Sequence, residues 1–67
     1  MRTSLRATVI VQGRIVRANI VYPETVARLL LKAGAEHCRV RYTQQGRAHD
    51  VSGSVFLSRY SLGSIFV

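Results

Sequence analysis

Residues 22–34, Y-P-E-T-V-A-R-L-L-L-K-A-G, carry the helical period around which the rest of the chain is organised. Pro23 suits the first position of a helix, where its missing N–H would have no partner in any case. Gly34 is typical of the residue that follows a helix. One apolar stripe at helical spacing is formed by Val26, Leu29, Leu30 and Ala33. The stretch therefore predicts a helix that buries this stripe.

A β-hairpin is predicted before the helix. Residues 5–11 and 14–22 alternate apolar and polar side chains, and Gln12-Gly13 forms a two-residue turn between them. The turn predicts an apolar face with the pairs Val9–Val16, Ala7–Ala18 and Leu5–Ile20, next to Val11–Arg14. The opposite face pairs Ile10–Ile15, Thr8–Arg17 and Arg6–Asn19. A slip of one residue would mix the two faces, so we expect this register to hold.

A second hairpin is predicted after the helix, around the turn Gln45-Gly46. It pairs Tyr42 with His49, Val40 with Val51, and Gln44 with Arg47 on one face. The other face pairs Arg41–Asp50 and Arg39–Ser52, and the opposite charges of Arg41 and Asp50 favour this register.

The segment after the second hairpin has a weaker pattern. Ser52-Gly53-Ser54 is interpreted as a bulge or a break, and residues 55–60 as a strand. The apolar tail, residues 54–67, is expected to complete the sheet or a homodimer interface through Leu62, Ile65, Phe66 and Val67. The whole sequence predicts one α+β domain over residues 1–67. Its order is ββαββ, with an antiparallel sheet of four to five strands and one helix packed on one face.

Charge is the main functional signal. Ten basic residues against three acidic ones give a net charge of +7, which favours binding to nucleic acid, anionic membranes or acidic proteins. If the helix covers the apolar sheet face, the opposite face carries arginines among small polar side chains, a composition suited to phosphate contacts. The candidate nucleic-acid-binding residues are Arg6, Arg14, Arg17, Arg28, Lys32, Arg39, Arg41 and Arg47.

A merely solvated or partner-covered basic face remains an alternative. The predicted face also exposes Ile10, Ile15 and Val21, which suggests that it is partly covered. It lacks the pair of aromatic side chains that single-strand binders use to stack bases.

Catalysis and metal binding are not expected. The sequences Glu36-His37-Cys38 and His49-Asp50 supply thiol, imidazole and carboxylate groups, but neighbouring strand residues point to opposite faces. Only Cys38 and His49 share a face, and two ligands are too few for structural zinc. A buried cysteine and a histidine stacked near Tyr42 are the simpler interpretation. No cofactor is expected, and none of the isolated glycines forms a phosphate-cradling loop.

Membrane binding is also not expected. No window approaches the ~18 apolar residues of a spanning helix, and the tail has no amphipathic helical period. A single cysteine rules out an internal disulfide, and a cytoplasmic location is the default.

A local similarity links part of the chain to DNA-binding regulators. Gly13-Arg14-Ile15-Val16, then Pro23-Glu24 opening a helix, then Lys32-Ala33-Gly34 and a strand, resemble the swapped-hairpin DNA-binding regulators. The resemblance covers about half of the chain. Extra residues separate strand from helix, and the Gly-Asp turn of that family is missing, so no DNA-contacting role is transferred.

The sequence thus predicts a small, basic, non-catalytic protein that binds DNA or RNA through arginines, as a regulator and a homodimer. The alternative is a protein–protein interaction module or inhibitor of the kind that phages or plasmids encode, which would bind an acidic patch on a host protein.

Overall fold

A computed structural model of the chain describes residues 4–66, and Phe66 by its backbone alone. The elements are β1 (Leu5–Val11), β2 (Arg14–Arg17), β3 (Ile20–Val21), α1 (Pro23–Ala33), the 3₁₀ turn η1 (Ala35–His37), β4 (Cys38–Gln44), β5 (Arg47–Ser52), α2 (Gly53–Ser61) and the 3₁₀ turn η2 (Ser64–Phe66). The α+β class and the antiparallel sheet are confirmed. The ββαββ order with one helix is wrong, because a second α-helix follows β5.

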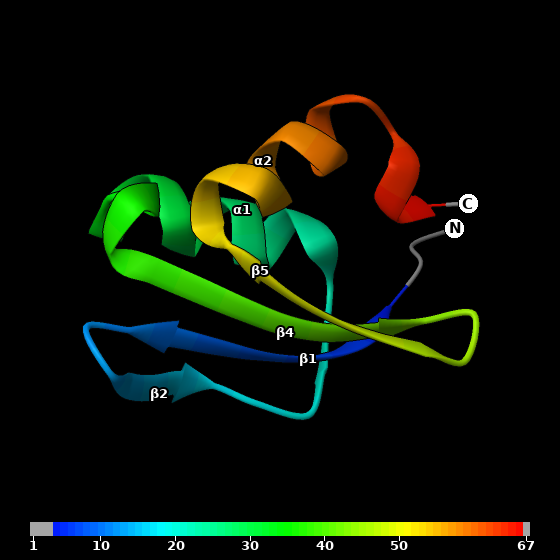
Figure 1. Cartoon of the computed structure of the whole chain (residues 1–67), viewed down its shortest axis with the longest axis horizontal. Coiled ribbons are helices and arrows are strands. Elements are labelled where there is room, and N and C mark those ends of the chain that lie inside the picture. The colour runs from blue at the N-terminus through cyan, green and yellow to red at the C-terminus, as the bar shows by residue number, and fades with distance from the viewer. Residues whose placement is uncertain (1–3, 67) are drawn as a thin grey trace.

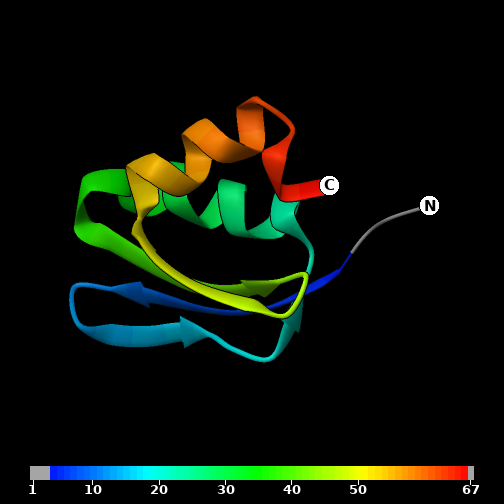
Figure 2. The same ribbon diagram turned by 45° about the vertical axis from the view of Figure 1, so that its right-hand side comes forward.

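The fold has two layers. The sheet contains five strands in the order β2-β1-β4-β5, and β3 also pairs with β1. All of these pairs are antiparallel. Both helices lie on the same side of the sheet, and no described element covers the other side (Figures 1 and 2).

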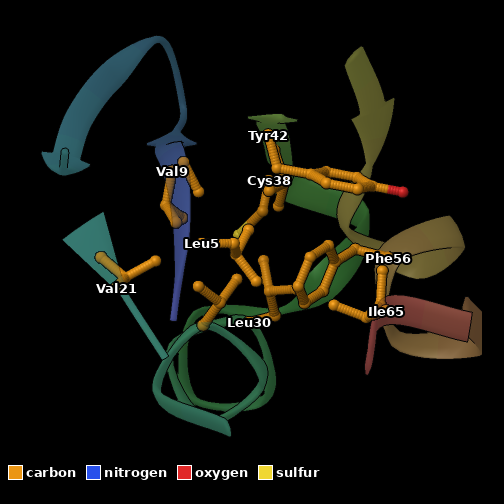
Figure 3. Packing of buried hydrophobic residues seen from close by; sticks show 11 residues of the cluster. Leu5, Val9, Val21, Leu30, Cys38, Tyr42, Phe56 and Ile65 are labelled. Atoms are coloured by element: carbon orange, nitrogen blue, oxygen red, sulfur yellow. The ribbon is translucent and has the colours of Figure 1, made fainter. Parts of the chain in front are cut away.

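The core lies between the sheet and the helices. Val9 and Val40 from the two central strands meet Val26 and Leu30 of α1 and Phe56 of α2, and all five side chains have no exposed surface. Figure 3 shows the aromatic ring of Phe56 inserted among the aliphatic side chains from the helix and sheet layers. Truncating a fully buried Phe to Ala typically costs about 3–5 kcal/mol, so α2 is an integral part of the fold.

The predicted helix is confirmed as α1. Pro23 occupies its first turn and is buried, and Gly34 follows it with φ of 88°, a value that residues with a side chain rarely adopt. The buried stripe is rotated from the prediction: Ala27 is buried with Val26 and Leu30, whereas Ala33 is exposed.

The second hairpin has the predicted register. Its pairs run from Gln44↔Arg47 through Tyr42↔His49 and Arg41↔Asp50 to Arg39↔Ser52. The first hairpin departs from prediction after its first two pairs, Val11↔Arg14 and Ile10↔Ile15. A β-bulge then makes Val16 an extra residue, so that Val9 pairs with Arg17, Arg6 with Ile20 and Leu5 with Val21.

The bulge exchanges the two faces beyond it. Val21 is buried with 4% of its surface exposed, whereas Ile20, predicted to be in the core, is 62% exposed. Ala18, also predicted on the apolar face, is exposed, while the Ala7 N–H donates to the carbonyl of Asn19 at 2.9 Å. This register places Leu5 and Val21 together in the core and gives the chain a direct entry into α1.

The segment predicted as a strand is helical. Ser52 caps α2, and its Oγ accepts a hydrogen bond from the N–H of Val55 at 3.3 Å. Phe56 is fully buried, and Leu57 and Tyr60 pack partly buried against the core, which is a helical spacing. The described tail adds no strand to the sheet, and Ile65 of η2 is buried in the chain's own core.

Candidate nucleic-acid interface

The open face is the side of β1, β4 and β5 that points away from the helices. Strand alternation and register place nine side chains on it: Arg6, Thr8, Ile10, Arg39, Arg41, Thr43, Ala48, Asp50 and Ser52. Pairing across the strands puts Arg41 between Thr8 and Asp50, and Arg6 next to Thr43. Three arginines and one carboxylate therefore share this surface with small hydroxyl side chains.

Asp50 holds two of these arginines. Its Oδ1 accepts from Nε of Arg39 at 2.7 Å, and its Oδ2 lies 3.5 Å from Nε of Arg41. All three side chains are about half exposed, so water screens the attraction and each pair contributes at most about 1 kcal/mol. The contact also orients Arg39, which is hydrogen-bonded through Nε, while Arg41 forms only the longer ion pair. Their terminal Nη groups remain for another anion.

Isoleucines border the arginines. Ile15 pairs with Ile10 and Ile20 pairs with Arg6, so both belong to the same side of the sheet as the open face. Ile15 is 67% exposed and Ile20 is 62% exposed. The prediction that Ile10 and Ile15 lie on this side is confirmed. Val21 was also expected on this side, but the bulge turns it into the core and brings Ile20 to this side in its place.

The structure does not gather the other candidate residues on the open face. Arg14 and Arg17 lie on the exposed edge strand β2, and the bulge pairs Arg17 with the helix-facing Val9 instead of Thr8. Arg28 and Lys32 are exposed on α1. Arg47 shares the helix-facing side of β5 with His49. The eight candidates thus form the open-face group Arg6, Arg39 and Arg41 and three separate sets.

Sequence reasoning assigned no role to Arg59, which the structure places on α2 beside the β4–β5 hairpin. Its Nη1 donates to the hydroxyl of Tyr42 at 2.7 Å. The helical spacing of Phe56 and Tyr60 after Ser52 was the signal that would have placed it on a helix.

The proposed interface residues of the tail have different environments. Leu62 is 80% exposed, whereas Ile65 is 3% exposed and belongs to the core. The side chain of Phe66 and the whole of Val67 lie outside the described residues. Of the four proposed interface residues, Leu62 is therefore the one whose side chain is both described and exposed.

The thiol and imidazole groups are arranged as structural residues. Cys38 is buried, and its S–H donates to the carbonyl of Gly34 at 3.3 Å. Burial raises the pKa of the Cys38 thiol, and the nearby Glu36 carboxylate raises it further, so the group stays protonated and weakly nucleophilic. His49 stacks on Tyr42 with ring centroids 4.8 Å apart, as predicted.

Residues 4–66 contain no group of three or more His, Cys, Asp or Glu side chains that could hold a metal ion. Within the same residues, no helix has the length and apolar character needed to cross a membrane.

Comparison with known proteins adds no assignment. The chain matches no protein-family model, no curated protein and no solved structure, so the local resemblance to swapped-hairpin regulators gains no support from these comparisons.

Proposed function

We propose that the protein binds nucleic acid through the open face, with arginines contacting backbone phosphates. The observation that carries this proposal is the projection of Arg6, Arg39 and Arg41 from two adjacent central strands on a face that no described helix covers. Asp50 is the single carboxylate among the nine open-face residues, so the face keeps a positive charge.

Asp50 supports the proposal because it binds Arg39 through Nε and leaves the end of its guanidinium group open. A guanidinium bound through Nε still presents two parallel N–H groups at its end, which match two oxygens of one phosphate. Arg39 and Arg41 are two residues apart, roughly 6.6 Å along the strand, so they can reach different phosphates. Threonine hydroxyls at positions 8 and 43 add neutral donors beside them.

The composition of the face favours duplex over single-stranded nucleic acid. None of the nine open-face residues is aromatic, and Tyr42, the central aromatic residue, points into the core (Figure 3). Base stacking, on which single-strand binding depends, therefore has no platform on this face. Binding through phosphates alone tolerates many sequences.

The proposal is tested by fluorescence anisotropy with labelled duplexes and single strands at about 50 mM and about 200 mM salt. Three phosphate contacts give a slope near −2.7 in log K against log salt, so affinity for a duplex is expected to fall about 40-fold between these conditions. Weaker binding to single strands is expected. No binding to any nucleic acid at the lower salt concentration would contradict the proposal.

A second candidate function is binding to an acidic protein, and the exposed Ile15 and Ile20 favour it. Apolar side chains gain little from contact with phosphates but contribute when a protein partner removes them from water. The test is a pull-down of a host protein in a stoichiometric complex. This complex should be lost in the double variant Ile15→Ser/Ile20→Ser. It should persist in Leu31→Ser, a control on α1 that is 71% exposed.

Among the four residues predicted to form a homodimer interface, Leu62 is the one that can be tested. Sedimentation velocity should show a dimer for the wild type and a monomer for Leu62→Ser. A wild-type monomer at high concentration would contradict a tail-mediated dimer. Ile65 is unsuitable for this test, because replacing a buried side chain would damage the fold.

A further inference from the structure

A polar pocket lies on the helix side of the sheet, away from the open face. It has a volume of about 300 Å³ and forms where the β4–β5 turn meets α2 and η2. Figure 1 shows that the β4–β5 turn (yellow-green) and the C-terminal η2 (red) lie at the same end of the molecule. The lining residues are Tyr42, Gln44, Gln45, Arg47, His49, Arg59 and Ser64. We refer to it as the hairpin pocket.

The side chains of the hairpin pocket suit an anion. Two guanidinium groups, one imidazole and two carboxamides line it, and none of the lining residues is acidic. Within residues 4–66, neither Arg47 nor Arg59 forms an ion pair with a carboxylate. Asp50 is engaged on the opposite face of β5. The positive charge of the pocket is therefore not neutralised by the described carboxylates.

Packing orients the inner part of the pocket. The hydroxyl of Tyr42 accepts from Nη1 of the half-buried Arg59 at 2.7 Å. The Tyr42 ring is stacked on His49 and makes an edge contact with Phe56 at 5.5 Å between centroids. Arg59 is thus held by a ring that is fixed on two sides, while its remaining N–H groups stay available.

The wall of the pocket is also tied down. The Nε2 amide of Gln44 donates to the carbonyl of Ser64 at 2.9 Å, which joins the hairpin to η2. Arg47 and Gln45 are exposed at the mouth. The pocket therefore combines an ordered interior with donors that can close on a ligand from outside.

We propose that the hairpin pocket binds the phosphate group of a phosphate monoester. A planar carboxylate is satisfied by one guanidinium fork, whereas a tetrahedral phosphate offers three terminal oxygens to donors that come from different directions. Here the donors come from β5, the hairpin turn and α2. The volume lies at the lower end of small-molecule sites, which suits a phosphate with a small attached group.

This inference is independent of nucleic-acid binding by the open face. The phosphate could belong to a free ester such as a mononucleotide or to the end of a nucleic-acid strand. Both sources present the same dianion to the pocket, and they differ only in the group attached to the ester oxygen. A titration with both kinds of ligand distinguishes them.

The test is an NMR titration of the ¹⁵N-labelled protein with inorganic phosphate and a 5′-mononucleotide, and with acetate at equal ionic strength. The side-chain signals of Arg47, Arg59 and Gln45 should shift and saturate with the phosphates. They should not saturate with acetate. Shifts of the same size with acetate, or shifts that rise linearly without saturation, would overturn the proposal.

The first hairpin provides a matched control variant. Arg47 follows the turn Gln45-Gly46, and Arg14 follows the identical turn Gln12-Gly13. Arg47→Gln should weaken mononucleotide binding about tenfold, the loss expected when one charge-assisted hydrogen bond is removed. Arg14→Gln, with the same change of charge, should leave it within about twofold of the wild type by the same scale. Equal weakening by both variants would mean that only net charge matters, and the pocket proposal would be wrong.

Oligonucleotides with and without a 5′-phosphate identify the source. A preference for the phosphorylated strand that disappears in Arg47→Gln assigns the pocket to nucleic-acid ends. Saturable mononucleotide binding without such a preference assigns it to free phosphate esters. If neither ligand saturates the pocket signals, the proposal is refuted. The double variant Arg6→Gln/Arg41→Gln should retain this phosphate binding, which separates the result from that of the open face.

Discussion

Gly53 is the residue at which the second helix meets the first part of the chain. A Cβ at this position would lie 2.5 Å from the carbonyl oxygen of Ala35 and 3.1 Å from side-chain carbons of Cys38 and Leu30. Real Cβ atoms do not approach a backbone oxygen so closely. Gly53 is therefore required because its missing side chain lets the N-terminus of α2 pack directly on η1.

Gly53→Ala is expected to lower the free energy of unfolding by about 1–3 kcal/mol, the usual effect of overpacking a tight contact. Urea denaturation followed by circular dichroism measures this change. Ser54→Ala, one residue along the same helix and exposed, is the control and should change stability by less than about 0.5 kcal/mol. A Gly53→Ala protein as stable as the wild type would contradict the close packing.

Cys38 makes the stability depend on pH at the alkaline end. Burial and the charge of Glu36 raise the pKa of its thiol above the ordinary value of 9.0. The folded state therefore holds the proton more firmly than the unfolded state. The resulting stabilisation is fully present below about pH 9 and is lost as the pH rises through the folded pKa.

Urea midpoints of the wild type and Cys38→Ala should accordingly diverge in their pH dependence above pH ~9. The two proteins differ at position 38 alone, so the difference between the two profiles isolates the thiol. Parallel profiles from neutral to alkaline pH would show that the thiol titrates alike in both states.

Some residue contacts were predictable from the sequence because short-range chemistry decides them. The Arg41–Asp50 pair and the Tyr42–His49 stack follow from one turn and strand alternation. One contact of Arg39 was not predicted. Its cross-strand partner is Ser52, as predicted, but its Nε also binds the diagonal neighbour Asp50, because long side chains reach beyond their direct partner.

At the scale of elements, the two hairpins show why one register was predictable and the other was not. Both begin with a Gln-Gly turn, and both follow the turn-derived register for the first two pairs. At the end of the first hairpin, the alternation offers an apolar β-branched side chain on either face, Ile20 on one and Val21 on the other. Burying Val21 instead of Ile20 therefore makes little difference locally, and packing with Leu5 and α1 decides the matter. Alternation alone does not contain that tertiary information.

Deletion of Val16 tests the bulge. It would leave Ile15 opposite Ile10 and Arg17 opposite Val9 in a regular ladder, and keep the Leu5–Val21 pair. We expect a folded protein with stability within about 1 kcal/mol of the wild type, because Val16 is exposed. The amide region of the NMR spectrum shows whether the deletion variant is folded. Contacts between the side chains of Leu5 and Val21, measured by NMR, show whether this pair is kept.

The matched control is deletion of Thr8, which lies in β1 between two partner strands. This deletion moves every following residue of β1 to the opposite face and should unfold the protein. Equal damage from both deletions would contradict the assignment of Val16 as the extra residue.

The prediction of a strand over residues 55–60 was wrong for a related reason. The apolar residues at positions 55, 56 and 57 fit a buried strand as well as one face of a short helix. The Ser52 cap and the close packing at Gly53 favour the helix, and the second of these is visible only in three dimensions.

At the scale of the whole molecule, the sheet has one side that faces the core and one side that is basic and open. Both helices cover one side of the sheet, so the hydrophobic core does not need the tail to add a strand (Figure 2). The other side is left to Arg6, Arg39 and Arg41, as the sequence predicted for these three residues. Arg17 was also expected there, and the bulge removes it from this side. The other four candidates lie where the sequence indicated, Arg28 and Lys32 on the helix and Arg14 and Arg47 directly after the turns.

We propose that the open face, rather than overall basic charge, binds nucleic acid. Arg6→Gln/Arg41→Gln and Arg28→Gln/Lys32→Gln both lower the net charge by two, but the first pair lies on the open face and the second on α1. Arg39 and Asp50 remain paired in both variants. The comparison therefore holds charge constant and changes only the face.

The decisive measurement is the salt dependence of duplex affinity for these two variants. Loss of two phosphate contacts should reduce the slope of log K against log salt by about 1.8 for Arg6→Gln/Arg41→Gln and leave it nearly unchanged for Arg28→Gln/Lys32→Gln. Equal reductions in the two variants, or a larger one for the α1 pair, would show that the open face is not the binding surface.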